Sequence, residues 1–213
     1  IGGSVVALAA LILAGVDGSE ADTLQASLRI GGQSLFAYQV RMAHAAGARH
    51  IVALVDQMPS SMVSALDSLR EDGIAVDIAR DAADAADRIH PDEQLLLIAD
   101  GIVADSLTVE RVAKNALPIL LCTDGTSGFQ SVERIDAGCH WAGLALLDGH
   151  ILRETASIVG EWALGPTLLR RAVQLGAARA FVEANVSAHA VLQFPQTQGE
   201  ADMIARSLAA APA

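Results

Sequence analysis

The stretch LILAGVDGSEADTLQASLRIGGQSL, residues 11–35, has the pattern of a buried strand, a glycine-containing loop and the start of a helix. Such an arrangement often cradles a phosphate, because backbone N–H groups at the start of the helix point at the anion. The loop carries three carboxylates, Asp17, Glu20 and Asp22, and its first basic residue is Arg29. The shape of the stretch therefore predicts a phosphate loop, whereas its charge opposes one.

The hydrophobic pattern repeats this strand-and-helix unit along the chain. Strands are expected at 8–14, 50–55, 74–78, 94–99, 118–122 and 141–147. Helices are expected at 33–46, 59–72, 81–88, 107–115, 151–159, 165–175 and 199–210. Buried strands that alternate with helices predict an α/β fold: a doubly wound, mostly parallel sheet with helices on both faces. No repeat or linker divides the sequence, so residues 1–213 are expected to form one domain, in which Asp148-Gly149 suits a hairpin turn.

The composition narrows the classes of partner. The formal net charge is −11, so a nucleic acid is not expected, because phosphate backbones bind basic surfaces. The longest apolar run, residues 5–14, is too short for a membrane helix, which needs about 20 residues. The sequence therefore predicts a cytoplasmic chain without a membrane segment. It begins at Ile1 rather than Met, which leaves open a fusion to a membrane domain beyond either end.

The cysteines and histidines show none of the spacings of a metal site or a redox motif. Cys122 and Cys139 are not part of a CxxC, so they are expected to be buried free thiols in a reducing compartment. The six histidines form no HxH or HxxxH pair, which disfavours a metal hydrolase. A GxSxG motif is also absent, which disfavours a serine hydrolase.

Three longer motifs resemble the nucleotidyltransferases that activate sugar or polyol phosphates. LILAG, its loop and LRIGGQSLFAYQVRMAHAAGARHIVALV are similar to the opening of that family, LAAGxGxR…PKxLxxVGGKPL. LLLIADGIVAD resembles the strand end where an Asp holds Mg²⁺ against the phosphates. ERIDAGCHWAGLALLDG and GEWALGPTLLRRAVQLGA fall where the acceptor half of the site lies. The resemblance covers residues 8–182 and implies a three-layer α/β fold that transfers a nucleotidyl group, with a cytidylyltransferase favoured.

The resemblance also assigns roles to residues. Asp100 would be the Mg²⁺ ligand and a catalytic residue. The catalytic cation that the family has in its loop would be replaced by Arg29, the nearest arginine, or by an arginine from elsewhere in the chain. The NTP would contact Leu13, Ala14, Gly15, Gly18, Ser19 and Gln25. The acceptor, a small phosphorylated sugar, polyol or amino alcohol, would contact Glu133, Asp136, Trp141, Gly143 and Glu161. The product would be an NDP-activated compound, and pyrophosphate would leave.

The opening loop departs from the family pattern in its cations. Glu20 stands where the family has an Arg, Gln25 stands where it has a Lys, and GGKP is GGQS. A carboxylate beside a triphosphate costs free energy unless a metal bridges the two. A second function is therefore open: a non-catalytic binding or regulatory module on the same fold. Such a module would be similar to the soluble halves fused to some membrane-bound CDP-alcohol phosphotransferases.

Plainer interpretations of these residues also remain open. The opening loop is also compatible with an ordinary strand-to-helix connection, and Asp100 with Gly101 is compatible with a simple turn at a strand end. Glu133, Asp136 and Glu161 are compatible with solvated charged segments. The base, the acceptor and the oligomeric state do not follow from the sequence.

Overall fold

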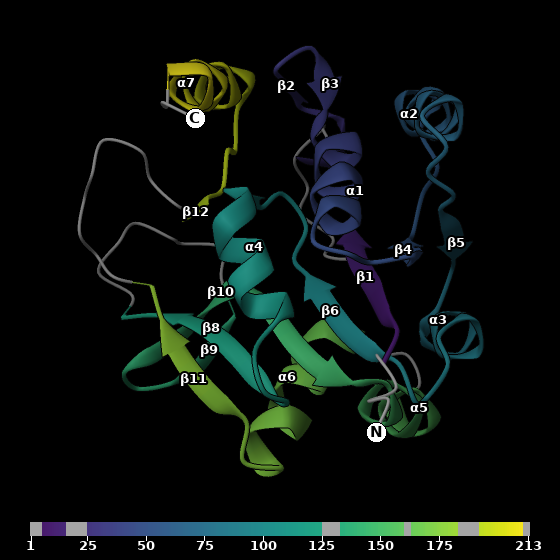
Figure 1. The fold of residues 1–213 in the computed structure, drawn as a ribbon, viewed down its shortest axis with the longest axis vertical. Coiled ribbons are helices and arrows are strands. Elements are labelled where there is room, and N and C mark those ends of the chain that lie inside the picture. The colour runs from purple at the N-terminus through teal and green to yellow at the C-terminus, as the bar shows by residue number, and fades with distance from the viewer. Residues whose placement is uncertain (1–5, 16–24, 125–132, 160–162, 183–191, 211–213) are drawn as a thin grey trace, which may run out of the picture.

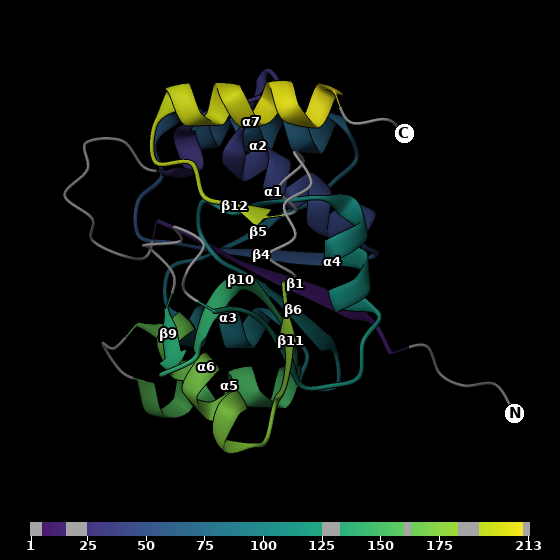
Figure 2. The same ribbon diagram turned by 90° about the vertical axis from the view of Figure 1, so that its left-hand side faces the viewer.

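The computed structural model of the protein describes residues 6–15, 25–124, 133–159, 163–182 and 192–210. Within these residues a mixed, mostly parallel sheet of eight strands lies between two layers of helices (Figure 1). Figure 2 shows one helix layer above the sheet and the other below it. The α/β class that the sequence predicts is thereby confirmed.

The sheet is built around the first strand of the chain. Its strands are β1 (Leu8–Ala14), β4 (His50–Val55), β5 (Asp77–Ala79), β6 (Gln94–Ile98), β8 (Ile119–Thr123), β9 (Arg134–Asp136), β10 (Cys139–Asp148) and β11 (Ala178–Phe181). Their order is β11-β8-β10-β6-β1-β4-β5, and β9 pairs with β10. β1 is parallel to β4 and β6, whereas β10 is antiparallel to β6 and β8. The carboxyl ends of β1, β4 and β6 therefore share one edge of the sheet.

β1 is central because it is apolar on both faces. Ile12 belongs to the hydrophobic cluster on one face, and Leu11 belongs to the cluster on the other. Both side chains are fully buried. Alternate residues of a strand point to opposite faces, so a strand covered by helices on both sides needs apolar residues throughout.

The helices form two layers over the sheet. The first contains α1 (Leu35–Ala45), α2 (Ser60–Glu71) and α4 (Ser106–Ala113), and the second contains α3 (Ala82–Arg88), α5 (Gly149–Val159) and α6 (Leu164–Gln174). Local capping explains several of the starts. The side chains of Ser34, Asp81 and Asp105 accept hydrogen bonds from the N–H groups of the first turns of α1, α3 and α4.

A small third layer covers the first helix layer at one end. It consists of the hairpin β2 (Arg29–Ile30) and β3 (Gln33–Ser34), the short pair β7 (Val103–Ala104) and β12 (Leu192–Gln193), and helix α7 (Gln198–Ala210). Ile30 of the hairpin packs in one apolar cluster with Ile204 of α7. Figure 2 shows α7 lying across this end of the molecule.

Two expectations about turns and thiols are wrong. Asp148-Gly149 closes no hairpin, because β10 ends at Asp148 and α5 begins at Gly149. A Cβ at Gly149 would lie 2.6 Å from a backbone carbonyl oxygen, so glycine permits a close approach of two chain segments. Cys122 and Cys139 are not free thiols but form a disulfide with Cα atoms 5.8 Å apart. Neighbouring strands bring together two cysteines that are distant in sequence.

Within the described part of the chain, no helix combines the length and the apolar content needed to cross a bilayer.

Candidate functional site

A hydrogen bond joins two of the strand ends at which the sequence predicts a site. The N–H group of Gly15, just after β1, donates to Asp100 Oδ2, just after β6, at 2.8 Å. Gly15 has a φ of +78° and Gly101 a φ of +72°, values that favour glycine because it has no Cβ. Each glycine therefore lets the chain turn at the strand end, and the two turns meet. Ala14, Gly15 and Asp100 are brought together as the sequence predicts.

Gln39 fixes the Asp100 turn from the helix side. This residue of α1 is 0% exposed, and its Nε2 donates to the carbonyls of Ala99, at 2.8 Å, and Ile102, at 3.2 Å. The two carbonyls flank Asp100 and Gly101, so one amide holds both sides of the turn. The sequence analysis missed this residue, although an amide on an otherwise apolar helix face was a signal that could have revealed it.

Tyr38 adds a further contact between α1 and the same loop. Its hydroxyl donates to the carbonyl of Ala104 at 2.8 Å. Burial, and then the charge of Asp105, raise the pKa of the Tyr38 phenol, which keeps it protonated as a donor. The segment from Ala99 to Ala104, which ends in β7, is therefore held by two neighbouring residues of α1.

The carboxylate of Asp100 has the chemistry that suits Mg²⁺. It is partly buried at a strand end, with one oxygen bonded to Gly15. Among the described residues no group of three or more His, Cys, Asp or Glu side chains is arranged to hold a metal. Mg²⁺ usually takes one or two protein carboxylates and completes its shell with water and substrate phosphates. Asp100 therefore fits as a single ligand, but not as part of a dedicated protein cage.

Arg29 lies in the β2–β3 hairpin, where its contacts are local. Its guanidinium donates to the carbonyl of Gly32, and its backbone exchanges two hydrogen bonds with Gln198 of α7, at 2.9 and 2.8 Å. These contacts join Arg29 to its own turn and to α7. The backbone of Gln25 forms a short 3₁₀ turn before the hairpin. Gly18 and Ser19 lie outside the described residues.

Two of the predicted acceptor residues are packed into the core. Trp141 is 4% exposed, and its indole N–H donates to the carbonyl of Leu144 at 2.9 Å. A Cβ at Gly143 would lie 2.6 Å from Ile102 Cδ1 and 2.8 Å from Phe194 Cζ. The indole donor is thus already used, and side chains of the chain cover Gly143. Leu13, which was assigned to the nucleotide, is likewise buried under α6.

Asp136 is engaged in a salt bridge. Its carboxylate lies 2.5 Å from Arg179 of β11. The Gly138 N–H group, which donates to Asp136 at 2.9 Å, and then the charge of Arg179 hold the pKa of Asp136 below its ordinary value. Glu161 lies outside the described residues.

Glu133 lines a cavity of about 210 Å³ between β9 and α6. The cavity is lined by Glu133, Arg134, Ile135, Pro166, Leu169, Arg170, Val173 and Gln174. Helix α6 begins against the central strand, because a Cβ at Gly165 would lie 2.8 Å from Leu13 Cδ1. β9 pairs with the first residues of β10, at the same edge of the sheet as Asp100. The β9 side of the cavity therefore lies at the edge of the sheet that carries the Asp100 turn.

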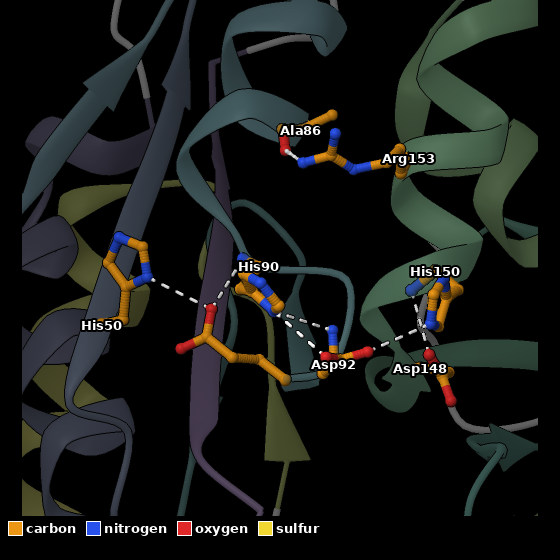
Figure 3. Close-up of polar contacts among 8 residues, drawn as sticks. His50, Ala86, His90, Asp92, Asp148, His150 and Arg153 are labelled. Atoms are coloured by element: carbon orange, nitrogen blue, oxygen red, sulfur yellow. Dashed lines mark hydrogen bonds and ion pairs between the residues drawn. The ribbon is translucent and has the colours of Figure 1, made fainter.

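Three histidines that are distant in sequence gather at the opposite edge of the sheet (Figure 3). His50 Nδ1 lies 3.4 Å from Glu93 Oε2, and the carboxylate of Asp92 lies 3.3 Å from His150 and 3.7 Å from His90. His50 begins β4, and Glu93 immediately precedes β6. This network connects the amino ends of the strands and so lies away from Asp100.

The architecture of the sheet and its helices is that of a nucleotidyltransferase fold. A similar solved structure is a Bacillus anthracis protein described as a glucose-1-phosphate thymidylyltransferase, crystallised with sucrose. The TM-score is 0.67 at 14% identity, and the match covers 94% of this chain and 96% of that one. No protein-family model and no curated protein match the sequence. At this identity the likeness shows the fold alone.

Proposed function

We propose that the chain is a nucleotidyltransferase domain that activates a small phosphorylated compound with an NTP, and we favour CTP. The contact between Gly15 N–H and Asp100 Oδ2 carries this proposal, because it joins the two strand ends where the fold binds ligands. The similarity in fold supports it, but fold alone does not specify a substrate.

In the proposed reaction, an oxygen of the acceptor phosphate attacks the α-phosphorus of the NTP. The bond from the α-phosphorus to the bridging oxygen breaks, and pyrophosphate leaves with the electron pair. Mg²⁺ held by Asp100 would supply neutralisation of phosphate charge. The backbone near Gly15, Gly18 and Ser19 would hold the phosphates, with Ala14 and Gln25 beside the nucleotide. Because Gln39 and Tyr38 hold the Asp100 loop, the carboxylate would be positioned before substrate arrives.

The acceptor would lie on the β9 and α6 side of the site. Glu133 and Asp136 of this region are the proposed contacts, and Glu161, three residues before α6 in the sequence, is a further proposed contact. Trp141 and Gly143 would shape the site from behind, through packing, because their own surfaces are covered. Arg29 carries a positive charge in the hairpin, and its guanidinium would contact a phosphate of the nucleotide only if it left the carbonyl of Gly32.

The second candidate is a non-catalytic binding or regulatory module. Two observations favour it: the loop carries Glu20 and Gln25 where the family has cations, and the Arg29 guanidinium donates to its own hairpin. An Mg²⁺-dependent nucleotidyl transfer places about four negative charges in the site, which these residues do not offset.

Calorimetric titration of the four NTPs, with and without Mg²⁺, tests the proposal. The parent should bind one NTP only with Mg²⁺, and Asp100→Asn should abolish that dependence while leaving the ligand-free melting temperature nearly unchanged. Asp87→Asn, at an exposed position of α3, is the matched control and should bind like the parent. Equal binding by Asp100→Asn and the parent would show that Asp100 is only a turn residue.

The double variant Glu20→Arg with Gln25→Lys separates the two candidates. It should tighten NTP–Mg²⁺ binding at least tenfold, which is about 1.4 kcal/mol. Pyrophosphate release by the parent, measured with a panel of phosphorylated acceptors, would establish the enzyme. Release by the double variant alone would establish the non-catalytic module. Unchanged NTP binding in a folded double variant would remove the nucleotide from the proposal.

A further inference from the structure

The cavity between β9 and α6 combines an apolar floor with charged groups of both signs. Its apolar lining comes from Ile135 of β9 and from three residues of α6: Pro166, Leu169 and Val173. Its polar lining consists of Glu133, Arg134, Arg170 and Gln174. Such a mixture is expected where a small ligand has an apolar body and charged ends.

The arginines of the cavity differ from other arginines nearby. Arg171 pairs with Glu154 and Arg179 pairs with Asp136, each at 2.5 Å. Within the described part of the chain, no ion pair includes Arg170 or Arg134, in a protein of net charge −11. Arg134 uses only its Nε, which donates to the backbone carbonyl of Asp136 at 3.1 Å. The terminal nitrogens of both guanidiniums are therefore suited to hold an anion, and phosphate matches their fork geometry.

Glu133 gives the same cavity a negative group. Its backbone is fixed by the N–H group of Trp141, which donates to the Glu133 carbonyl at 2.8 Å. The carboxylate has no ion pair within the described residues, although two arginines line the cavity with it. A ligand with a cation at one end and a phosphate at the other would satisfy both kinds of group.

The apolar floor limits what lies between the two charges. A sugar ring carries several hydroxyl groups, and each loses its bonds to water against isoleucine, leucine, proline and valine. A short methylene chain loses nothing in the same place. The lining contains no aromatic side chain, whereas quaternary ammonium groups are typically bound in aromatic cages. The cation that fits is a primary ammonium beside a carboxylate.

We propose that this cavity binds a zwitterionic amino-alkyl phosphate, a phosphorylated primary amino alcohol, as the acceptor. The inference rests on the proposed function, because it names the acceptor class of the same site. Arg170 and Arg134 hold the phosphate, and Glu133 holds the ammonium group. The cavity is lined by α6, the helix whose start packs against Leu13 of the central strand, so it lies beside the strand whose end carries the proposed nucleotide loop.

Direct binding of 2-aminoethyl phosphate, measured by calorimetry without nucleotide, tests the inference. Choline phosphate, glucose-1-phosphate and inorganic phosphate are the comparison ligands, and each should bind at least tenfold more weakly. Arg170→Gln and Glu133→Gln should each weaken binding at least tenfold, because each leaves a ligand charge without its partner. Arg70→Gln and Glu71→Gln, at exposed positions of α2, are the matched controls and should bind like the parent.

The ligand series and the variants have separate meanings. Equal binding of inorganic phosphate and 2-aminoethyl phosphate, or unchanged binding in folded Arg170→Gln and Glu133→Gln, would overturn the inference. Binding of an NTP with Mg²⁺ but no binding of 2-aminoethyl phosphate would also overturn it, while the proposed function would stand. Binding of 2-aminoethyl phosphate that depends on both side chains, without any NTP binding, would support the ligand class and refute the transferase.

Discussion

Replacement of Gln39 by leucine tests whether one buried amide holds the Asp100 turn. Leucine has a similar volume, so the change removes the hydrogen bonds at 2.8 and 3.2 Å while largely conserving the packing. Each carbonyl that loses its donor in the core costs about 1–3 kcal/mol. The change also removes Gln39 Oε1, a buried oxygen that has no hydrogen-bond partner within the described residues. Its removal stabilises the folded variant by about 1–3 kcal/mol. The two lost hydrogen bonds together cost about 2–6 kcal/mol, so the net loss of stability is about 1–3 kcal/mol when low values are matched with low and high with high.

Gln39→Glu is the sharper companion variant. It keeps the shape of the side chain but replaces the donating Nε2 by an oxygen that faces the carbonyls of Ala99 and Ile102. A buried carboxylate without a partner costs more than a lost neutral bond. We therefore expect Gln39→Glu to be less stable than Gln39→Leu at neutral pH.

Urea denaturation measures the loss in the free energy of unfolding, provided that its dependence on urea concentration is the same in variant and parent. Titration with NTP and Mg²⁺ measures the effect of the change on the site. Gln57→Leu, at an exposed position, is the control and should remain within about 0.5 kcal/mol of the parent. Gln39→Leu should weaken Mg²⁺-dependent binding more than an equally destabilised core variant distant from the turn. A Gln39→Leu variant as stable as the parent, with unchanged binding, would refute the role of the amide.

Three further predictions concern the packing of the core and the dependence of stability on pH. Leu11→Asp should prevent soluble expression, because it buries an unpaired charge in the central strand. The control Val6→Asp, at an exposed position, should express normally. Normal melting of Leu11→Asp would exclude a central position for that strand. In urea denaturation, Gly143→Ala should lose about 1–3 kcal/mol more stability than Gly176→Ala. Both glycines have φ above +80°, but of the two only Gly143 would place its new Cβ against other side chains. Equal losses would mean that the side chains around Gly143 move aside without cost. NMR titration should give Asp136 a pKa below its ordinary value of 3.8. The stability that the charged carboxylate contributes is then fully present above pH 3.8 and is lost as the pH falls through the lower pKa of the folded protein. A measured pKa at or above 3.8 would contradict the contacts described.

The meeting of the turns after β1 and β6 could be predicted from the sequence, because each turn follows a strand with a local signal. The carboxyl ends of parallel strands share an edge, so Gly15 and Asp100 could be expected to meet once their strands were recognised. The sequence does not show which strand-end residues face a ligand. Trp141 and Gly143 follow the same pattern as a binding segment, yet β10 and its neighbours bury them. Burial depends on what packs above a residue, which no single segment contains.

The sequence by itself determined the elements whose signals are local. The strands β1 and β4 and the helices of the sheet layers follow from continuous apolar runs, amphipathic periods and capping side chains, which act within a few residues. Only the tertiary structure decided the reversal of β10, the disulfide between Cys122 and Cys139, and the hold of Gln39 on a turn 60 residues further along the chain. Those features arise where separate segments meet. Their free energy comes from pairings between strands and from buried groups that have no partner nearby in the sequence.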